Sequence, residues 1–292
     1  MAAELVAGLF STHVPRLMIF DDAARRAYMG RNVSTFYDAL AQIQREKIAP
    51  LAFETFVIVD THWHSTLDFV INAHDRLAGV YTSDELPHML GEYAYDYPGD
   101  PELARAVADE ARAAGLPAIA SAHRGLPVHY GTLNPMHYYN PGPPKRRVLT
   151  LSVCDTAESE PNLRMGAAIA RAVARTGRRV VLVASGGLSH RFWPLAVIRE
   201  RASADPADIS SPELRAWDER IMAWWRAGEH AAVIAHADEF RRVAAPEGRF
   251  AHYLMLAGAF GASDWRAPGV QFGRYEAAIG TGQANFWFDA AG

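Results

Sequence analysis

The chain has 292 residues, of which half are hydrophobic and 21% are charged, and its formal net charge is −4. A chain of this size and composition can bury a full hydrophobic core, and we expect one domain over residues 1–292. The acidic balance and the scattered Lys and Arg residues argue against a nucleic-acid partner, and the short apolar run at the amino terminus argues against a signal peptide or a membrane span. We therefore expect a cytoplasmic protein.

Apolar runs alternate with helical patterns along the chain. Apolar runs that end in polar or glycine residues predict strands at residues 4–10, 54–60, 148–154 and 179–185. Apolar periodicity and start signals predict helices at residues 33–48, 101–114, 161–176, 212–226 and 247–260. The alternation predicts an α/β fold with a central, mostly parallel or mixed sheet flanked by helices. We expect the irregular stretches 82–100 and 121–146 to be loops over the active site.

Three histidines each follow the end of a predicted strand. They are His13 after LVAGLF, His62 after TFVIVD and His190 after RRVVLVAS. Each of them alone would more often be a structural residue. Because ligand sites assemble at the carboxyl ends of the strands of such a sheet, the three together predict one site there, most naturally a metal centre. The single cysteine, Cys154, excludes a thiolate metal cluster.

A metal centre of this kind needs a third ligand. Two histidines and one carboxylate form the facial triad that is typical of non-heme Fe(II), which must hold a substrate and dioxygen together. Glu247 is the best candidate, because Pro246 and Gly248 mark a helix start from which an acid can point into a shared cleft. From its position alone, an ordinary glutamate in the first turn of a helix is the better interpretation.

His62 and His64 together allow a different metal site. An HxH pair after a strand binds zinc in the metal-dependent amidohydrolases, so a zinc hydrolase using His13, His62, His64 and an acid is an alternative. That fold needs a longer series of strand-end ligands, and here a histidine-bearing strand precedes the pair. A noncatalytic binding protein with an incomplete site is a further alternative.

Eight segments, in the same order over nearly the whole chain, resemble one enzyme family. They are STHVPRL, DTHWH, ELPH with YDYPGDPELA, YGTLNPM, ASGGLSHRF, PEGRFAHYLMLAGAFG and IGTGQANFWF. They look like the class III extradiol ring-cleavage dioxygenases, and most like the branch that acts on 3,4-dihydroxyphenylacetate. The resemblance implies an α/β enzyme that uses Fe(II), or Mn(II), with O2 as co-substrate to open a catecholic ring beside its two hydroxyls.

The resemblance also implies roles for individual residues. The histidines of the THVP and DTHW segments, His13 and His62, correspond to metal ligands, and the glutamate of the EG segment, Glu247, corresponds to the third. The histidine of the SGxLSH segment, His190, corresponds to the acid/base. An imidazole with a pKa near 6.5 can take a proton from a catechol hydroxyl and return it as the ring opens, which an amide cannot do.

One segment departs from the family pattern. Many members have Asp-His-Gly before the TLxPM-like run, with the histidine lining the substrate pocket, whereas this chain has His129, Tyr130 and Gly131. The identity of the second polar group of the pocket is therefore undecided. Either Tyr130 replaces the family histidine, or His129 or His123 supplies an imidazole from a shifted position.

The residues near these motifs suit a small aromatic diol as substrate. Trp63, Tyr130 and Phe192 are candidates for an aromatic slot around a planar ring. Four arginines are candidates to pair with a substrate carboxylate, namely Arg16, Arg124, Arg191 and Arg249. We expect 3,4-dihydroxyphenylacetate as substrate, with gallate-like, pyridinediol-like and aminophenol compounds still open, and a homodimer or higher homo-oligomer.

Overall fold

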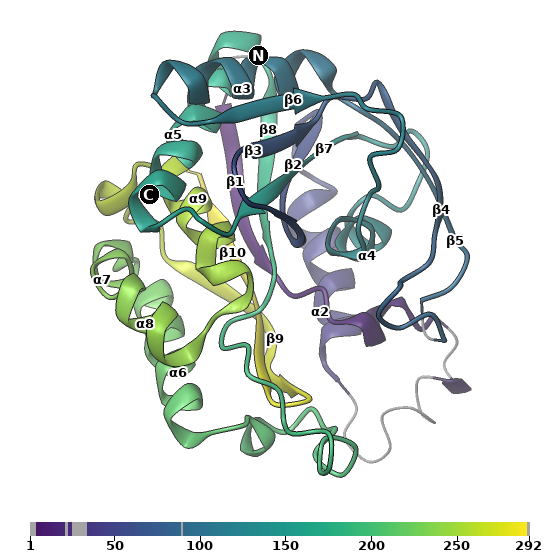
Figure 1. The fold of residues 1–292 in the computed structure, drawn as a ribbon, viewed down its shortest axis with the longest axis vertical. Coiled ribbons are helices and arrows are strands. Elements are labelled where there is room, and N and C mark those ends of the chain that lie inside the picture. Colours follow the sequence, from purple (N-terminus) through teal and green to yellow (C-terminus); the bar gives the residue numbers. More distant parts are fainter. Residues whose placement is uncertain (1–3, 21–22, 25–33, 89, 291–292) are drawn as a thin grey trace.

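The computed structural model describes residues 4–20, 23–24, 34–88 and 90–290 (Figure 1). The strands are β1 (Glu4–Ser11), β2 (Thr55–Ser65), β3 (Phe69–Asn72), β4 (Arg76–Tyr81), β5 (Tyr93–Pro98), β6 (Ala118–Ser121), β7 (Arg147–Cys154), β8 (Arg179–Ser185), β9 (Gly269–Ala278) and β10 (Thr281–Asp289). The α-helices are α2 (Phe36–Ile43), α3 (Pro101–Ala113), α4 (Tyr130–Tyr139), α5 (Ser159–Thr176), α6 (Pro212–Ala227), α7 (His230–Ala235), α8 (Ala237–Ala244) and α9 (Ala251–Ala259). Shorter helical turns are η1 (Pro15–Met18), η2 (Gln44–Ile48), η3 (Pro206–Asp208), η4 (Glu247–Phe250) and η5 (Ala262–Asp264). Among the described residues, no helix is both long and apolar enough to cross a membrane.

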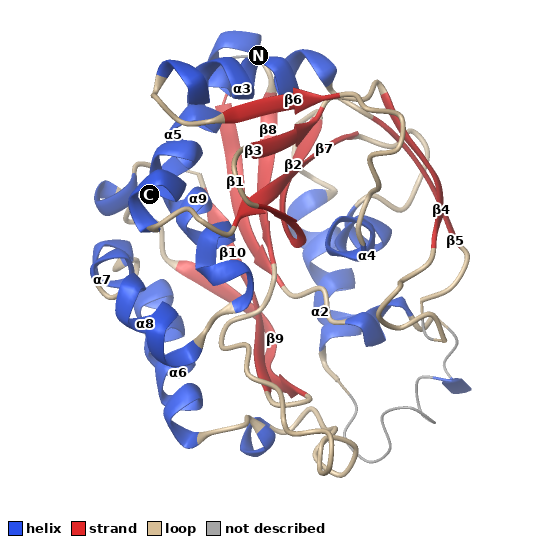
Figure 2. Ribbon diagram, viewed as in Figure 1, coloured by secondary structure: helices blue, strands red, loops and turns tan. Residues whose placement is uncertain are grey.

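Eight strands form one mixed sheet in the order β6-β3-β7-β2-β8-β1-β10-β9, drawn in red in Figure 2. The central strands β7, β2, β8 and β1 run parallel to one another. β10 and β9 add an antiparallel edge, and β3 pairs antiparallel with β7. The predicted α/β fold with a mixed central sheet is confirmed. β4 and β5 form a separate two-stranded ribbon.

Alternate residues of β2 face opposite layers of helices. Val57 and Val59 belong to the core that includes residues of α3, α5, α6 and α9. Phe56 and Ile58 belong to the core that includes residues of α2 and α4. Figure 2 shows these two groups of helices on opposite sides of the sheet. Because successive side chains of a strand point to opposite faces, one continuous apolar run serves both cores.

The carboxyl ends of β1, β2 and β8 meet at one edge of the sheet. The register places Ser11 of β1 and Asp60 of β2 both opposite Ser185 of β8. The segments that follow Ser11 and Ser185 and the part of β2 that follows Asp60 therefore start side by side. This is the edge at which the sequence predicts a ligand site.

Two segments that we expected to be loops contain regular structure. Residues 82–100 include β5, and residues 121–146 include α4. The sequence of β5 is YAYDYP, in which tyrosine recurs at every second position, as is typical of a strand. Its many tyrosines and final proline nevertheless favoured the interpretation as a loop. α4 contains Gly131 and Pro135, which are poor helix formers, and it is stabilised by burial of most of its residues.

Other elements differ less from the expectation. The helix expected at 33–48 is α2 followed by a π-helical turn, and its residue 33 lies outside the described residues. The sequence did not lead us to expect β3, β4, β6, β9, β10, α7 or α8. These are mostly short or edge elements, for which the hydrophobic pattern is weakest.

His230, at the start of α7, is a buried uncharged residue between helices. Its Nδ1 is 2.8 Å from the Tyr253 hydroxyl, and its Nε2 is 2.9 Å from the Ala267 carbonyl. The Trp265 ring stacks on it with a centroid distance of 3.6 Å. Burial lowers the pKa of His230 to about 4. The folded protein therefore resists protonation of this ring.

Acid should destabilise the fold through His230. An unfolded histidine takes up a proton near pH 6.5, so the contribution of His230 is fully present above that pH and is lost as the pH falls toward 4. Between pH 7 and pH 5 the loss should be about 2 kcal/mol in the free energy of unfolding. Urea unfolding with a chelator present measures it, and His230→Gln should remove this part of the pH dependence. An identical pH dependence in the variant would contradict the assignment.

Candidate metal centre

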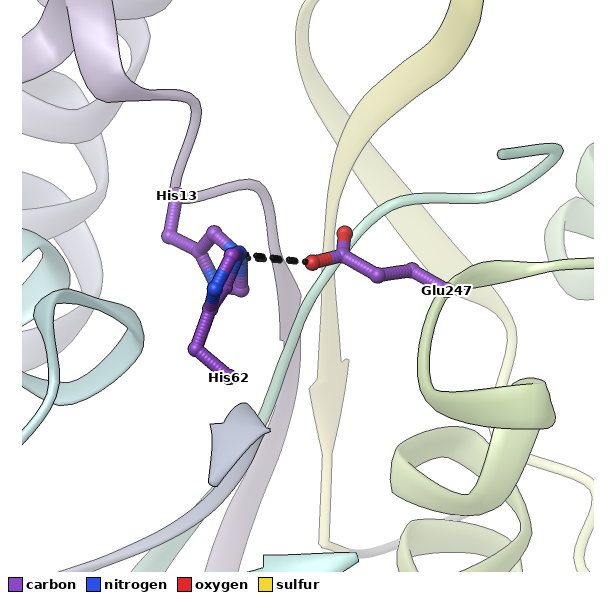
Figure 3. Close-up of side chains that lie close together, drawn as sticks. All are labelled: His13, His62 and Glu247. Carbon is purple, nitrogen blue, oxygen red and sulfur yellow. Dashed lines mark hydrogen bonds and ion pairs between the residues drawn. The ribbon is translucent and has the colours of Figure 1, made fainter. Parts of the chain in front are cut away.

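Three possible metal ligands converge at the carboxyl edge of the sheet (Figure 3). His13 follows β1, His62 lies in β2, and Glu247 opens the turn η4 between α8 and α9. One possible donor atom from each residue lies within 4.8 Å of the other two. Glu247 Oε1 is 2.9 Å from His13 Nε2 and 3.3 Å from His62 Nε2. The structure thus brings together the three residues that the sequence suggested, and their role as ligands stays a prediction.

A bulge in β2 aims His62 at this site. The β2–β7 register shifts between Asp60 and His64, so residues 61–63 lie in a bulge. A bulge bends a strand and changes the direction of its side chains. Asp60 Oδ1 accepts a hydrogen bond from the His62 backbone N–H at 2.8 Å, which holds the bulge in place. Gly131 packs against this carboxylate, since a Cβ there would lie 2.1 Å from Asp60 Oδ1.

Glu247 stands on a left-handed turn and not in the first turn of a helix. Gly248, Arg249 and Phe250 have φ angles of 52°, 56° and 66°, and α9 begins only at Ala251. The predicted helix start at residue 247 is therefore wrong. Non-glycine residues in this region are strained, and such strain is common where a site needs a fixed geometry.

Glu247 is buried, and neighbouring groups bind both of its carboxylate oxygens. Thr61 Oγ1 donates to Oε1 at 3.0 Å, and the Gly187 backbone N–H donates to Oε2 at 2.5 Å. Burial alone would raise the pKa of this carboxyl. The nearby imidazoles of His13 and His190 outweigh burial and hold the pKa well below its usual range. The carboxylate is therefore ionised at neutral pH and available to a cation.

The hydrogen bonds of His13 fit a cation between its ring and Glu247. Ser185 Oγ donates to the Gly131 carbonyl, so it accepts from His13 Nδ1, which is 2.9 Å away. His13 Nε2 then faces Glu247 and carries either a proton or a metal. Burial opposes the charged imidazole, but the negative charge of Glu247 prevails and raises the pKa of His13 above its usual value. Two imidazoles and one carboxylate at this spacing fit a divalent transition metal.

His190 lies beside the three donors, in the segment that follows β8. Its Nε2 is 3.8 Å from Glu247 Oε2, and its ring meets Phe192 edge-on with a centroid distance of 4.8 Å. Burial lowers the pKa of His190, and the opposing charge of Glu247 does not cancel this effect. A neutral imidazole can accept a proton at neutral pH. The position and the protonation state both suit the predicted acid/base.

Tyr130, at the start of α4, contacts two of the possible ligands. Its hydroxyl is 2.5 Å from His62 Nε2. Its ring lies 4.0 Å from the His62 ring and 5.5 Å from the His13 ring between centroids. Burial raises the pKa of Tyr130, so the hydroxyl keeps its proton and can donate a hydrogen bond in the pocket.

The other two candidates for the pocket position are placed differently. His129 is half-buried near the Trp63 ring, at 6.4 Å between centroids, and burial lowers its pKa. His123 is exposed, and its carbonyl lies 3.1 Å from His74 Nε2. Of the three residues that the sequence left open, the structure brings Tyr130 against the histidines of the site.

His64 faces a different partner from His62. Its Nδ1 is 2.8 Å from Asp155 Oδ1, and His64 is exposed while Asp155 is half-buried. Within the described part of the chain, His13, His62 and Glu247 form the one set of three side chains that meets the distances of a metal site. The alternative zinc site that used His64 therefore lacks support in the geometry.

The predicted slot and arginines are only partly assembled. Trp63 is buried, whereas Phe192 is 49% exposed beside His190. Arg16 is buried, and its Nη2 is 3.0 Å from Glu276 Oε2, so it is held by β9. Three arginines are exposed and remain candidates for a substrate carboxylate, namely Arg124, Arg191 and Arg249.

Sequence reasoning missed the residues that support the ligands. Thr61, Ser185 and Gly187 contact Glu247 or His13, and Asp60 holds the bulge. Asp60 and Thr61 end or follow the strand predicted at 54–60, and Ser185 and Gly187 end or follow β8. The strand-end argument that selected the histidines could have selected these polar and glycine neighbours as well.

Comparisons with known proteins match the chain to two named dioxygenases and to one solved structure. The chain is 29% identical over 250 residues to the 3,4-dihydroxyphenylacetate 2,3-dioxygenase of Escherichia coli, covering 86% of this chain and 88% of that protein. It is 26% identical over 244 residues to the alpha subunit of a 2-aminophenol 1,6-dioxygenase of Pseudomonas sp., covering 82% and 85%. A crystal structure of an uncharacterized protein of Escherichia coli K12 matches with a TM-score of 0.64 and 17% identity, covering 97% and 99%, which shows a shared fold.

A family model identifies the chain more directly. The model of the catalytic LigB subunit of aromatic ring-opening dioxygenase matches residues 7–284. This range contains His13, His62, His190 and Glu247, and the match confirms the resemblance seen in the sequence motifs. The chain therefore belongs to the LigB family of aromatic ring-opening dioxygenases, which are class III extradiol enzymes.

Proposed function

We propose that the protein is an Fe(II)-dependent extradiol dioxygenase. Its reaction would insert both atoms of O2 and open a catecholic ring beside the two hydroxyls, giving a muconic semialdehyde. The observation that carries this proposal is the convergence of His13, His62 and Glu247, with His190 next to them. Mn(II) suits the same donor set and is the second candidate metal.

The proposed chemistry divides between the metal and the protein. Fe(II) held by two imidazoles and one carboxylate would leave open coordination positions, lower the pKa of a catechol hydroxyl and let the electron-rich ring pass charge to dioxygen. His190, neutral because of its burial, would take a proton from the second hydroxyl and return it as the ring opens. The Tyr130 hydroxyl would donate a hydrogen bond to the same part of the substrate.

The substrate is proposed to be 3,4-dihydroxyphenylacetate or a related substituted catechol. This assignment is supported by the relative of that name and by the exposed Arg124, Arg191 and Arg249 near the site motifs. The 2-aminophenol enzyme among the relatives makes aminophenols the next class to test. We further propose one catalytic domain, a cytoplasmic location and a homodimer or higher homo-oligomer.

Oxygen uptake by protein loaded anaerobically with Fe(II) tests the function. We expect uptake, together with a yellow ring-opened product, for 3,4-dihydroxyphenylacetate. Unsubstituted catechol should have a roughly ten- to hundredfold lower kcat/KM, because it lacks one charged hydrogen-bonding pair worth about 1.5–3 kcal/mol. Equal values for the two compounds would exclude carboxylate recognition but keep ring cleavage.

The controls separate the alternatives. Zn(II)-loaded protein should consume no oxygen, since zinc has no redox chemistry. Protein that binds stoichiometric Fe(II) yet consumes no oxygen with any catechol, gallate, pyridinediol or aminophenol would overturn the proposal. Protein that binds no metal would instead indicate a noncatalytic family member.

A further inference from the structure

A buried carboxylate lies under the segment that carries His190. Asp218, on α6, is fully buried and accepts three hydrogen bonds. Ser189 donates two of them, from its backbone N–H to Oδ1 at 2.9 Å and from its hydroxyl to Oδ2 at 2.6 Å. The Tyr275 hydroxyl donates the third, to Oδ2 at 2.6 Å. An acid from a distant helix is thus bound to the residue directly before His190.

β10 holds the same segment from another side. The Leu188 N–H donates to the Gly282 carbonyl at 2.8 Å, and the Gly282 N–H donates to the Ser189 carbonyl at 2.9 Å. A Cβ at Gly282 would lie 1.8 Å from Asp218 Oδ2, so the strand and the carboxylate are in close contact. The backbone of Leu188 and Ser189 is therefore held between α6 and β10.

The ring of His190 depends on this backbone for its direction. Its Nε2 is 3.8 Å from Glu247 Oε2, which is beyond hydrogen-bond distance. The Phe192 ring beside it is 49% exposed. The firmer attachment of His190 is through its main chain, whose N–H donates to the Ala244 carbonyl at 3.2 Å. A shift of the backbone at Ser189 would therefore move the imidazole.

We propose that Asp218 is a positioning residue for His190. The proposal rests on the proposed function, in which His190 transfers protons. Within the described chain, the hydrogen bonds of Asp218 go to Ser189 and Tyr275, so it acts through Ser189 and not on the substrate. Fixing both the N–H and the hydroxyl of Ser189 sets the direction in which the chain presents the next side chain. Proton transfer is sensitive to that direction.

The burial of this acid supports a role beyond filling space. Burial raises the pKa of Asp218 to about 7, although three hydrogen bonds oppose the change. An apolar residue of similar size would avoid this desolvation penalty. An acid at this position instead provides two acceptor oxygens, which an apolar residue lacks.

Asp218→Asn tests the proposal by kinetics. The amide keeps the shape but replaces one acceptor oxygen with a donor, so it cannot accept all three hydrogen bonds, and either the Ser189 N–H or the two hydroxyls lose their acceptor. Iron content should equal that of the wild type, KM for the catechol should stay within about twofold, and kcat should fall by at least about tenfold. In a His190→Gln background, Asp218→Asn should change the residual kcat by less than about twofold. Tyr275→Phe, which keeps both bonds to Ser189, should lower kcat by less than about threefold.

A second measurement needs no turnover. In protein loaded with Zn(II) and labelled with 13C at histidine, the ring signal that is missing from His190→Gln identifies His190. Asp218→Asn should shift, split or broaden this signal and leave that of the buried His230 unchanged. If the wild-type protein consumes no oxygen, the proposed function is wrong. The ring signal of His190 still tests whether Asp218 positions His190.

Three results would overturn the proposal. They are a wild-type kcat in Asp218→Asn, an equal loss of kcat with and without His190, and an unchanged His190 signal. If Asp218→Asn does not accumulate as folded protein, Ser189→Ala replaces it in both comparisons. We expect that variant to lose at least about threefold in kcat only when His190 is present.

Discussion

His13→Ala, His62→Ala and Glu247→Ala should each abolish stoichiometric iron binding and reduce turnover by at least about a thousandfold. Removing a residue that only supports a ligand usually weakens metal affinity about ten- to hundredfold, and removing a ligand itself should exceed this. Glu247 should show the largest effect, because it supplies the negative charge of the set and lies within 3.3 Å of both imidazoles. Metal analysis of purified protein, alongside oxygen uptake, measures both losses.

His64→Ala is the matched control for the ligand variants. His64 lies close to His62 in sequence but is exposed and bound to Asp155, so its loss should leave the iron content unchanged. Loss of metal in this variant would revive the zinc site built on the HxH pair. Full iron loading of Glu247→Ala would show that the carboxylate is not a ligand.

His190→Gln should keep its iron and lose turnover by about a hundred- to ten-thousandfold. The neutral amide retains a polar group beside Glu247 but can neither take nor return a proton. Because His190 Nε2 lies 3.8 Å from Glu247 Oε2 and is outside the set of three donors, the metal assay should separate it from the ligand variants. Steady-state kinetics should place the loss in kcat, with little change in KM.

The control for this variant is another imidazole outside the site. His88→Gln changes an exposed histidine and should retain both iron and turnover. If His190→Gln came out free of iron, His190 would belong with the ligands. If it kept normal turnover, the acid/base role would pass to another group, with Tyr130 the nearest candidate.

The sequence predicted the central part of the fold and the residues of the candidate site. Strands β1, β2, β7 and β8 are long apolar runs buried on both faces, and such runs are easy to recognise. β9 and β10 were missed because glycine and polar residues interrupt the apolar residues of β9 and make up much of the first half of β10, so neither strand shows a clear apolar pattern. α4 was missed because its glycine and proline have low helix propensity, whereas burial of most of its residues stabilises the helix.

The local geometry of the site could not be predicted. Residue order placed His62 just beyond a strand, but the bulge that aims it depends on Asp60 and on the tight packing of Gly131, far away in the sequence. Pattern reasoning placed Glu247 at a helix start, whereas a left-handed turn carries it. Asp218 lies within the helix predicted at residues 212–226, and only the tertiary fold brings it against Ser189. Each of these features depends on tertiary contacts.

The origin of the three donors also bears on how the protein matures in the cell. His13 and His62 are synthesised before Glu247, which belongs to a turn after α8. A nascent chain that lacks this turn offers two imidazoles without the carboxylate, so the three donors are complete only after α8 and the turn have been made. Metal acquisition should therefore follow the synthesis of this turn, and metal at about a thousandfold over its Kd would add about 4 kcal/mol to the stability of the folded protein.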